Sequence, residues 1–340
     1  MRNKDIAVAA LIFAGFTFSV KAQDKTEEFE NRLIKLENIS SKLPRISGQL
    51  NLRYQYRENN EVKHNLDVRR ARLDFRGEIG TKFDYRAQIE FASNVKLLDG
   101  FVKWKPLGNF YVQGGQYKLP FSIENQYSPF NMETIDYSLA VNYLSSLEDI
   151  SGIKSSGRDV GLMVGGNFFQ KNGYSIIEYS LGLFNGNGIN TSDNNSTKDF
   201  SGLVYINPVK YLSLSVSHYN GNSGIAGNSI ERVRTGYGLR YDDKKIVVRS
   251  EYIHGKTGHL KSKGVYVLAG YTFIHKLQPI LKYDYFKRDK HSAATKVNAA
   301  LVGINYFINR SLKFQVNYSY TDVKTSSDYS HVAVQLIALF

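Results

Sequence analysis

Apolar and polar residues alternate with a period of two from Ile46 to the last residue, Phe340. Residues 83–91, for example, read FDYRAQIEF, with an apolar residue at every second position. Successive side chains of a β-strand point to opposite faces, so this pattern predicts strands with one face against an oily environment and the other against water. After the first 22 residues, no segment has 18 uncharged apolar residues in a row, which excludes a membrane protein built from helices.

Sixteen segments carry the alternation, and most are nine to thirteen residues long, enough for a tilted crossing of a bilayer. The predicted strands are 46–57, 66–79, 82–92, 96–105, 110–118, 158–169, 173–184, 199–207, 211–219, 230–241, 245–254, 264–274, 277–287, 296–308, 311–321 and 329–340. Short turns alternate with generally longer connections. The fold class predicted is therefore all-β, a 16-stranded antiparallel transmembrane β-barrel that starts and ends on the periplasmic side.

A soluble β-sandwich also alternates, but sixteen strands without an internal repeat would need two domains and a linker, and no linker is visible. Aromatic residues on the apolar face gather near strand ends, as the girdles of membrane barrels do. These are Tyr54, Tyr56, Trp104, Tyr241, Tyr283, Tyr285, Tyr318 and Tyr320. A closed barrel also leaves no unpaired strand edge in lipid, which favours it over an open sheet.

The segment before the barrel has a different organisation. Residues 1–22 combine a basic head, an apolar stretch and small residues before Gln23, the layout of a secretory signal peptide. Residues 23–44 show helical spacing of apolar residues and end at Pro44, which predicts a short periplasmic helix. The spacing fits either a coiled coil or one amphipathic helix resting on a neighbouring surface. Residues 45–340 are the predicted barrel.

The polar face of the predicted strands is rich in basic residues. The cations on it are Arg53, Arg57, Arg70, Arg72, Arg76, Arg86, Lys103, Lys105, Arg232, Arg234, Arg240, Arg249, Lys282 and Lys313, against the acids Asp74, Glu78, Asp84, Glu90, Asp99, Glu178, Glu251 and Asp284. Mixed charges can simply solvate a pore and pair across strands. The excess of cations, mostly arginines whose planar groups match phosphate oxygens, favours a pore that prefers anions.

Other classes of function find little support in the composition. The formal net charge of +13 is not gathered into a basic run, so no nucleic-acid partner is expected. The chain has no cysteine, and the aspartate near position 193 lacks the spacing of a calcium loop, so no metal or other cofactor is expected. The seven histidines are scattered and no acid–histidine pair stands out, which argues against a catalytic site.

The connection 119–157 is far longer than any other, and a loop of this length without strands is usually functional. We expect it to fold into the barrel and to narrow it. Its charges are mostly acidic: Glu124, Glu133, Asp136, Glu148 and Asp149, against Lys154. Acids that line the constriction would weaken or abolish an anion preference.

Several short motifs together resemble the phosphate-selective porin O and P family of bacterial outer membranes. They are Arg69-Arg70-Ala71-Arg72, residues 98–102 (LDGFV), 115–122 (GQYKLPFS), 157–161 (GRDVG) and 184–186 (FNG). The resemblance implies a trimer of sixteen-stranded barrels, a third loop folded inside, and an arginine ladder that leads to a central oxyanion site. The resemblance assigns that site, in this sequence, to Arg69, Arg70, Asp99, Lys118 and Ser122. Glu133-Thr134 departs from the family, which usually has an arginine after the acid.

Strict alternation puts Arg69 on the lipid face, so a role in the site requires a bulge there. The full set of candidate anion-binding residues in the pore is Arg53, Arg69, Arg70, Arg72, Arg76, Arg86, Asp99, Lys118, Ser122 and Arg158.

The function predicted is passive diffusion of small anions, with phosphate as a candidate, through a porin in the bacterial outer membrane. Its expected partners are the transported anions, outer-membrane lipid and two further copies of the chain. The alternatives are a structural envelope barrel and an enzyme built on an outer-membrane barrel.

Overall fold

The computed structural model describes residues 43–224, 229–274 and 276–340. The predicted signal peptide, 1–22, and residues 23–42 of the predicted helix lie outside this part of the chain. Within the described residues, no helix has both the length and the apolar character needed to cross a membrane.

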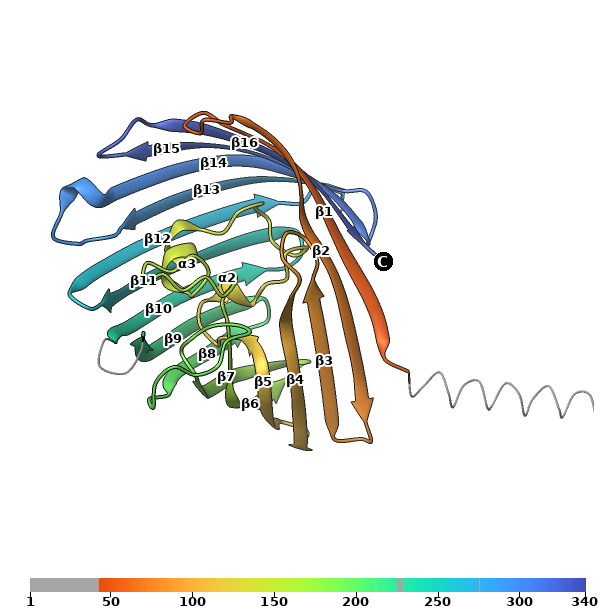
Figure 1. The fold of residues 1–340 in the computed structure, drawn as a ribbon. Coiled ribbons are helices and arrows are strands. Elements are labelled where there is room, and N and C mark those ends of the chain that lie inside the picture. The colour runs from red at the N-terminus through yellow and green to blue at the C-terminus, as the bar shows by residue number, and fades with distance from the viewer. Residues whose placement is uncertain (1–42, 225–228, 275) are drawn as a thin grey trace, which may run out of the picture. The chain divides into compact units, whose positions relative to one another are not determined.

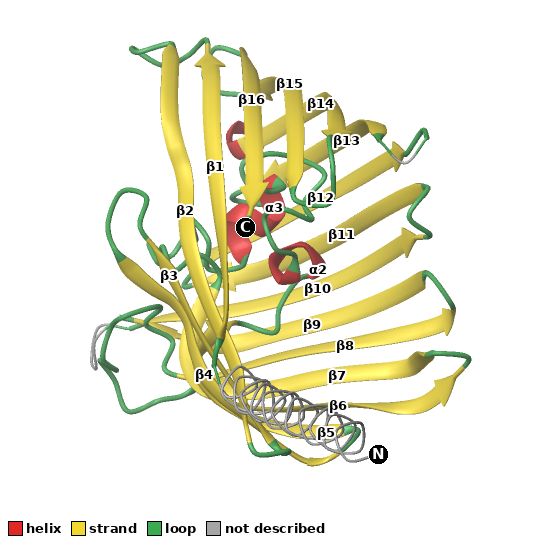
Figure 2. Ribbon diagram, turned by 90° about the vertical axis from the view of Figure 1, so that its right-hand side faces the viewer, coloured by secondary structure: helices red, strands yellow, loops and turns green. Residues whose placement is uncertain are grey.

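Sixteen strands form one closed barrel in chain order, with β1 beside β16 (Figures 1 and 2). The strands are β1 (Arg45–Arg57), β2 (His64–Ile79), β3 (Phe83–Glu90), β4 (Lys96–Leu107), β5 (Phe110–Lys118), β6 (Arg158–Lys171), β7 (Tyr174–Phe184), β8 (Asp199–Val209), β9 (Leu212–Ser223), β10 (Ile230–Asp242), β11 (Ile246–Thr257), β12 (Leu260–Tyr271), β13 (Leu277–Lys287), β14 (Lys296–Phe307), β15 (Leu312–Val323) and β16 (Tyr329–Leu339). The predicted 16-stranded antiparallel barrel is confirmed. Some strands are longer than predicted at the end that bears the long connections: β9 continues to Ser223 and β12 starts at Leu260. Backbone pairing there extends beyond the apolar pattern because it satisfies the N–H and C=O groups of the chain.

The lumen wall is polar and satisfies its own hydrogen bonds. On β1, β16, β15, β14 and β13 a ladder of amide side chains links Asn51 to Gln335, Gln335 to Gln315, Gln315 to Asn305 and Asn305 to Gln278, over distances of 2.9–3.2 Å. All five side chains are buried. Large apolar and tyrosine side chains are exposed on the opposite face, among them Leu281, Tyr283, Tyr318 and Tyr320. The inward polar and outward apolar faces are those of a barrel whose outside meets lipid.

The alternation slips by one residue in β2. Leu66 and Val68 are exposed, and Asp67 binds Arg53. Arg69 binds the loop residue Asp136. Further along β2 the even-numbered positions face inward, as the buried Asp74 does. Two successive residues therefore share the inner face near Arg69, as at a β-bulge, and the expectation from strict alternation that Arg69 faces lipid is wrong.

Residues 119–157 contain two short helices, α2 (Ile123–Gln126) and α3 (Leu139–Leu144), which lie within the ring of strands in both views (Figures 1 and 2). The base of this loop is closed by a hydrogen bond of 2.9 Å from the Leu119 N–H to the Gly157 carbonyl. Gly157 has a φ of +69°, and an added Cβ would overlap the side chain of Asn125, so the exit from the loop requires glycine.

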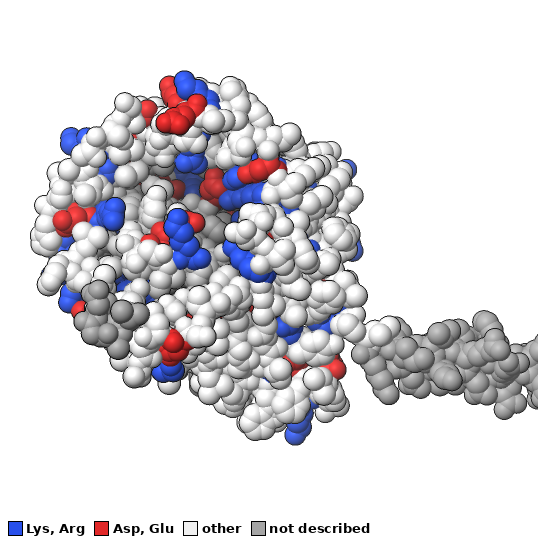
Figure 3. Space-filling view, in the orientation of Figure 1, with Lys and Arg blue, Asp and Glu red and all other residues white. Residues whose placement is uncertain are grey.

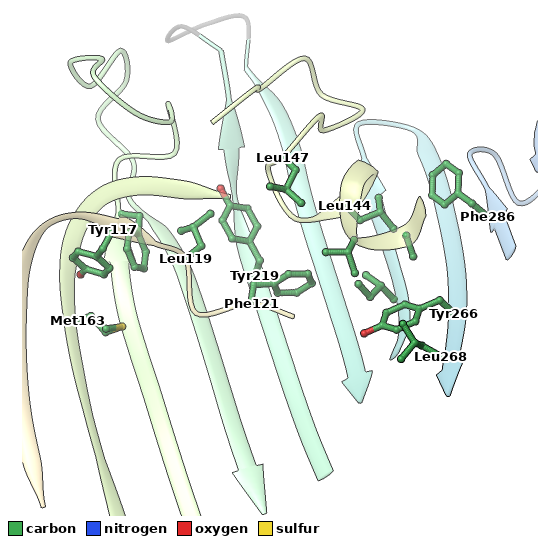
Figure 4. Close-up of a cluster of buried hydrophobic side chains, with 14 of the residues drawn as sticks. Tyr117, Leu119, Phe121, Leu144, Leu147, Met163, Tyr219, Tyr266, Leu268 and Phe286 are labelled. Atoms are coloured by element: carbon green, nitrogen blue, oxygen red, sulfur yellow. The ribbon is translucent and has the colours of Figure 1, made fainter. Parts of the chain in front are cut away.

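An apolar cluster attaches the loop to the wall (Figure 4). Its loop members include Leu119, Phe121, Ala140, Val141, Leu144 and Leu147, and its wall members include Tyr117, Met163, Tyr219, Ile253, Tyr266, Leu268 and Phe286. Leu144 of α3 is only 1% exposed. Burial of this many side chains holds the loop against β5, β6 and β9–β13.

Candidate functional site

A cavity of about 410 Å³ lies between the loop and the wall formed by β1–β3, β5, β6 and the end of β16. Its charged lining residues are Arg72, Arg76, Arg86, Lys118, Arg158 and Asp74. The lining from the loop consists of Gln126 and residues 128–131. The space-filling view shows a hollow bordered by Lys and Arg side chains together with some Asp and Glu side chains (Figure 3). The cavity thus has five cationic side chains and one carboxylate in its wall.

Carboxylates hold two of the arginines in fixed positions. Arg86 on β3 reaches both Asp74, at 2.6 Å, and Asp99, at 2.8 Å. Arg158, the first residue of β6, contacts Asp99 through its Nε at 2.7 Å. Asp99 is 1% exposed, so it lies behind the arginines and not in the cavity. A chain of alternating acid and base across β2, β3, β4 and β6 therefore presents guanidinium groups to the lumen.

The other cations of the cavity are held in different ways. Arg72 contacts the buried Glu90 at 2.7 Å. Lys118 donates a hydrogen bond of 2.6 Å to the Tyr127 carbonyl of the loop. Arg76 contacts Asp74 but keeps 57% of its side-chain surface exposed, the largest share among the paired arginines. Its guanidinium is the one most available to a solute.

The acids of the loop are paired and do not form a ring around the cavity. Arg249 on β11 contacts both Glu124, at 3.3 Å, and Glu133, at 2.8 Å. Asp149 contacts Arg234 of β10 at 3.2 Å, and the exposed Glu148 contacts Lys154 at 3.1 Å. Because Glu124 and Glu133 are buried against a wall cation, their charges are compensated where the loop is attached.

Asp136, the remaining loop acid, belongs to a second group of arginines. Arg69 donates to it at 2.6 Å and to the Ile135 carbonyl at 2.7 Å, and Arg53 lies 3.9 Å away. Burial alone would raise the pKa of the Asp136 carboxyl, but the neighbouring cations, Arg69 first, hold that pKa well below its ordinary value. Asp136 thus remains ionised and fixes this part of the loop to β1 and β2.

Wall carboxylates also bind the loop through its backbone. Glu251 on β11 accepts hydrogen bonds from the Ile123 N–H at 2.7 Å, the Glu124 N–H at 2.9 Å and the Ser122 hydroxyl at 3.0 Å. Asp284 on β13 accepts the N–H of Leu139, the first residue of α3, at 3.0 Å. A wall acid therefore accepts two backbone N–H groups at the start of α2 and one at the start of α3.

The structure brings together only part of the set of residues selected from the sequence. Arg72, Arg76, Arg86, Lys118 and Arg158 line one cavity, with Asp99 directly behind them. Arg53 and Arg69 lie together at Asp136, outside the lining of that cavity, and the charged groups around Arg70 include Arg69, Arg72 and Asp136. Ser122 is fully buried on Glu251, where it serves the attachment of the loop.

The lining residues that the sequence did not indicate come from the loop: Gln126 and residues 128–131. These residues have no periodicity, so no signal in the sequence gave their orientation. Across the described ranges, no three His, Asp or Glu side chains are grouped as a metal site would require.

Solved porin structures share the fold. An anion-selective porin from Comamonas acidovorans matches with a TM-score of 0.70 and 12% identity over 87% of this chain and 99% of that one. OmpF of Salmonella typhi, in a complex with daunomycin, matches with a TM-score of 0.64 and 14% identity over 88% and 99%. OmpT of Vibrio cholerae, in a trimer form, matches with a TM-score of 0.61 and 10% identity over 87% and 99%. At these identities the likeness concerns the fold.

A search of curated proteins returned no match. The family model of the phosphate-selective porins O and P matches residues 45–222 and 237–337, which is most of the barrel. This match confirms the resemblance seen in the short motifs. The chain belongs to the phosphate-selective porin O and P family, and is a non-enzymatic channel of the bacterial outer membrane.

Proposed function

We propose that this porin is an anion-selective diffusion channel and that the cationic cavity is its selective constriction. The observation that carries the proposal is the division of charge: five Lys and Arg side chains line the cavity beside one Asp, while the acids of the loop are paired elsewhere. A wall of this kind favours anions because it replaces part of their hydration with donors of positive charge. The anion-selective Comamonas porin with the same fold is consistent with this reading.

Phosphate is the solute that we propose for the channel. Arginine presents donors in a planar fork that matches two phosphate oxygens, and three of the cavity arginines are positioned by acids of the barrel wall. Those same acids, Asp74, Asp99 and Glu90, compete with a passing anion for the guanidinium groups. Competition keeps the binding weak, so an anion can enter and also leave.

The decisive measurement is the reversal potential of single channels in a salt gradient. We expect an anion-selective value for the wild-type protein and a shift toward zero for the double variant Arg76→Gln, Lys118→Gln. Lys154→Gln is the matched control, because it removes a cation from an exposed pair at Glu148. A cation-selective wild type would refute the proposal.

Phosphate preference has its own test. Added phosphate should block chloride current in the wild type, and the double variant should need more phosphate for the same block. Equal block in both proteins would place the phosphate site away from these residues. A barrel without measurable conductance would favour the structural alternative.

We also propose that three copies of the chain assemble, as the family resemblance implies. The trimer form of the Vibrio OmpT structure is consistent with this assembly. Light scattering of the protein in detergent would give the mass of the oligomer, and a monomeric mass would contradict the proposal.

A further inference from the structure

A row of four lysines crosses neighbouring strands on the outside of the barrel. Lys263 of β12 pairs in register with Lys287 of β13, and Lys287 pairs with Lys296 of β14. The N–H of Lys324, just after β15, donates to the Lys296 carbonyl at 3.2 Å. Four cations therefore stand side by side on β12–β15, which are adjacent in the barrel (Figure 1). We call these four residues the lysine row.

The lysine row faces lipid and not the lumen. Residues an even number of positions away on the same strands are exposed apolar or tyrosine side chains: Val267, Tyr283, Val302 and Tyr320. The residues between them, such as Tyr266 and Asp284, are buried inside. The row lies at the strand ends that bear the long connections, which are extracellular in outer-membrane barrels. Tyrosines just below it mark the level of the lipid headgroups.

Within the described part of the protein, the row is not neutralised by contact ion pairs. Like charges that stand directly opposite on neighbouring strands are destabilising. None of the ion pairs among the described residues includes a lysine of the row. The side chains of the nearby acids contact other groups: Asp322 accepts from Asn298, Asp328 from Tyr320, Asp289 from the His291 N–H and Glu231 from Lys256. Lys287 donates only to the Lys290 carbonyl.

Further cations stand beside the row. Lys256 pairs in register with Lys261, and His254 pairs with Lys263. Clusters of lysine at a membrane surface typically bind anionic lipids. Adjacent strands are about 4.8 Å apart, so four of them span roughly 14 Å, and the row is long enough to contact more than one phosphate group.

We propose that the lysine row is a binding site for the phosphate groups of an anionic lipid in the outer leaflet. The site is separate from the channel, because it lies on the outer face of β12–β15 and the cationic cavity lies inside β1–β6. Its ligand neutralises the repulsion within the row.

The test compares two triple variants of the full chain in detergent. Lys263→Gln, Lys287→Gln, Lys296→Gln removes three charges from the row. The control, Lys82→Gln, Lys171→Gln, Lys210→Gln, removes three lysines near the short turns at the other end of the barrel. The probe is a fluorescent glycolipid with two phosphate groups. Each surface lysine contributes roughly fivefold to such binding, so the row variant should bind about a hundredfold more weakly and the control within about twofold of wild type.

Two further measurements test whether the phosphate groups of the lipid are what the row binds. The dephosphorylated glycolipid should bind the wild type as weakly as the phosphorylated one binds the row variant. Equal binding of both glycolipids to the wild type, or equal loss in both variants, would overturn the proposal. Inorganic phosphate that raises the melting temperature of the wild type as much as the glycolipid does would show a free-anion site and would overturn the assignment to lipid.

Folding is checked independently of lipid. Both variants should form channels of wild-type conductance. Without lipid, the melting temperature of the row variant should be equal to or above that of the wild type, because the substitutions remove repulsion. A lower melting temperature would show that the lysines stabilise the barrel by themselves, which contradicts the argument.

Discussion

The two sides of the lumen carry the same kind of side chain in opposite roles. On β2, β3 and β6, arginines border an open cavity and pair with Asp74, Asp99 and Glu90 of the wall itself. On β10 and β11, Arg234 and Arg249 are also inward, but the loop covers them and its acids pair with them. We call these the open wall and the covered wall.

The difference lies in where the carboxylate comes from. On the open wall the acids come from the strands, and Arg76 and Arg86 keep 57% and 24% of their side-chain surface exposed. An acid that pairs from the loop turns the arginine into an attachment point and removes it from the pore. The number of inward arginines alone therefore does not describe the charge that a solute would meet, because the position of the acids matters as well.

Arg249→Gln should have the largest effect of any single change. It leaves Glu124 and Glu133 buried without their cation, and breaking a buried pair in this way costs about 3–5 kcal/mol. We expect a lower melting temperature, and a larger and noisier conductance as the loop loosens. The triple variant in which Glu124, Glu133 and Arg249 are all Gln should recover much of the stability. An unchanged Arg249→Gln channel would show that the covered wall does not hold the loop.

Leu144→Ala tests the apolar part of the same attachment. Leu144 is buried in the cluster between α3 and the wall. Its truncation should cost about 2–3 kcal/mol, in the lower part of the range for such changes because the loop can settle into some of the space. Urea unfolding would measure the cost, and single-channel records should show brief openings to a higher level. Selectivity should stay anionic between those openings.

Arg76→Gln is the matching change on the open wall, where the expected effects are reversed. The side chain of Arg76 is more than half exposed, so its loss should change the stability by less than about 1 kcal/mol. The reversal potential should nevertheless move toward zero, because an exposed guanidinium leaves the cavity. If Arg76→Gln changed the stability but not the selectivity, the proposed difference between the open wall and the covered wall would be contradicted.

The smallest expected effect is that of mild acid on Asp136. Its pKa is held low, so its stabilising ion pairs are complete above the ordinary carboxyl pKa of about 3.9 and are lost only as the pH falls through the lower pKa of the folded protein. His331, Arg53 and Arg69 also face this carboxylate. Because 41% of the side chain is open to water, the contribution is modest.

The measurement is the conductance of the wild-type channel between pH 7 and pH 4, compared with that of Asp136→Asn at pH 7. The conductance of the wild type should stay constant over this pH range, because the loop remains attached to the wall. The variant should show a small increase in conductance. A wild-type channel that opens already at pH 5 would contradict the assignment of the low pKa.

The barrel was largely predictable because one physical rule, alternation between oil and water, acts along every strand. The rule failed where the backbone shifts by a residue, at Arg69, since a bulge has no signature in the alternation itself. Elsewhere the alternation correctly predicted that Arg249 and Arg72 point into the barrel. It could not predict that the two arginines have different roles. Those roles depend on contacts between residues more than a hundred positions apart, such as Glu124 with Arg249. The lining from Gln126 and residues 128–131 was hidden because an irregular loop has no repeating spacing to interpret.

Glu251 and Asp284 bind the two short helices through backbone N–H groups, and this has a consequence for how the sequences of such channels can change. Backbone amides are present whatever side chain they belong to, so much of the anchorage survives substitution along α2 and at the start of α3. The neighbouring stretch that borders the passage, residues 128–131, is free to change its chemistry on a frame that stays in place. A porin of this design can change the solute that it passes without changing how its inward-folded loop is attached.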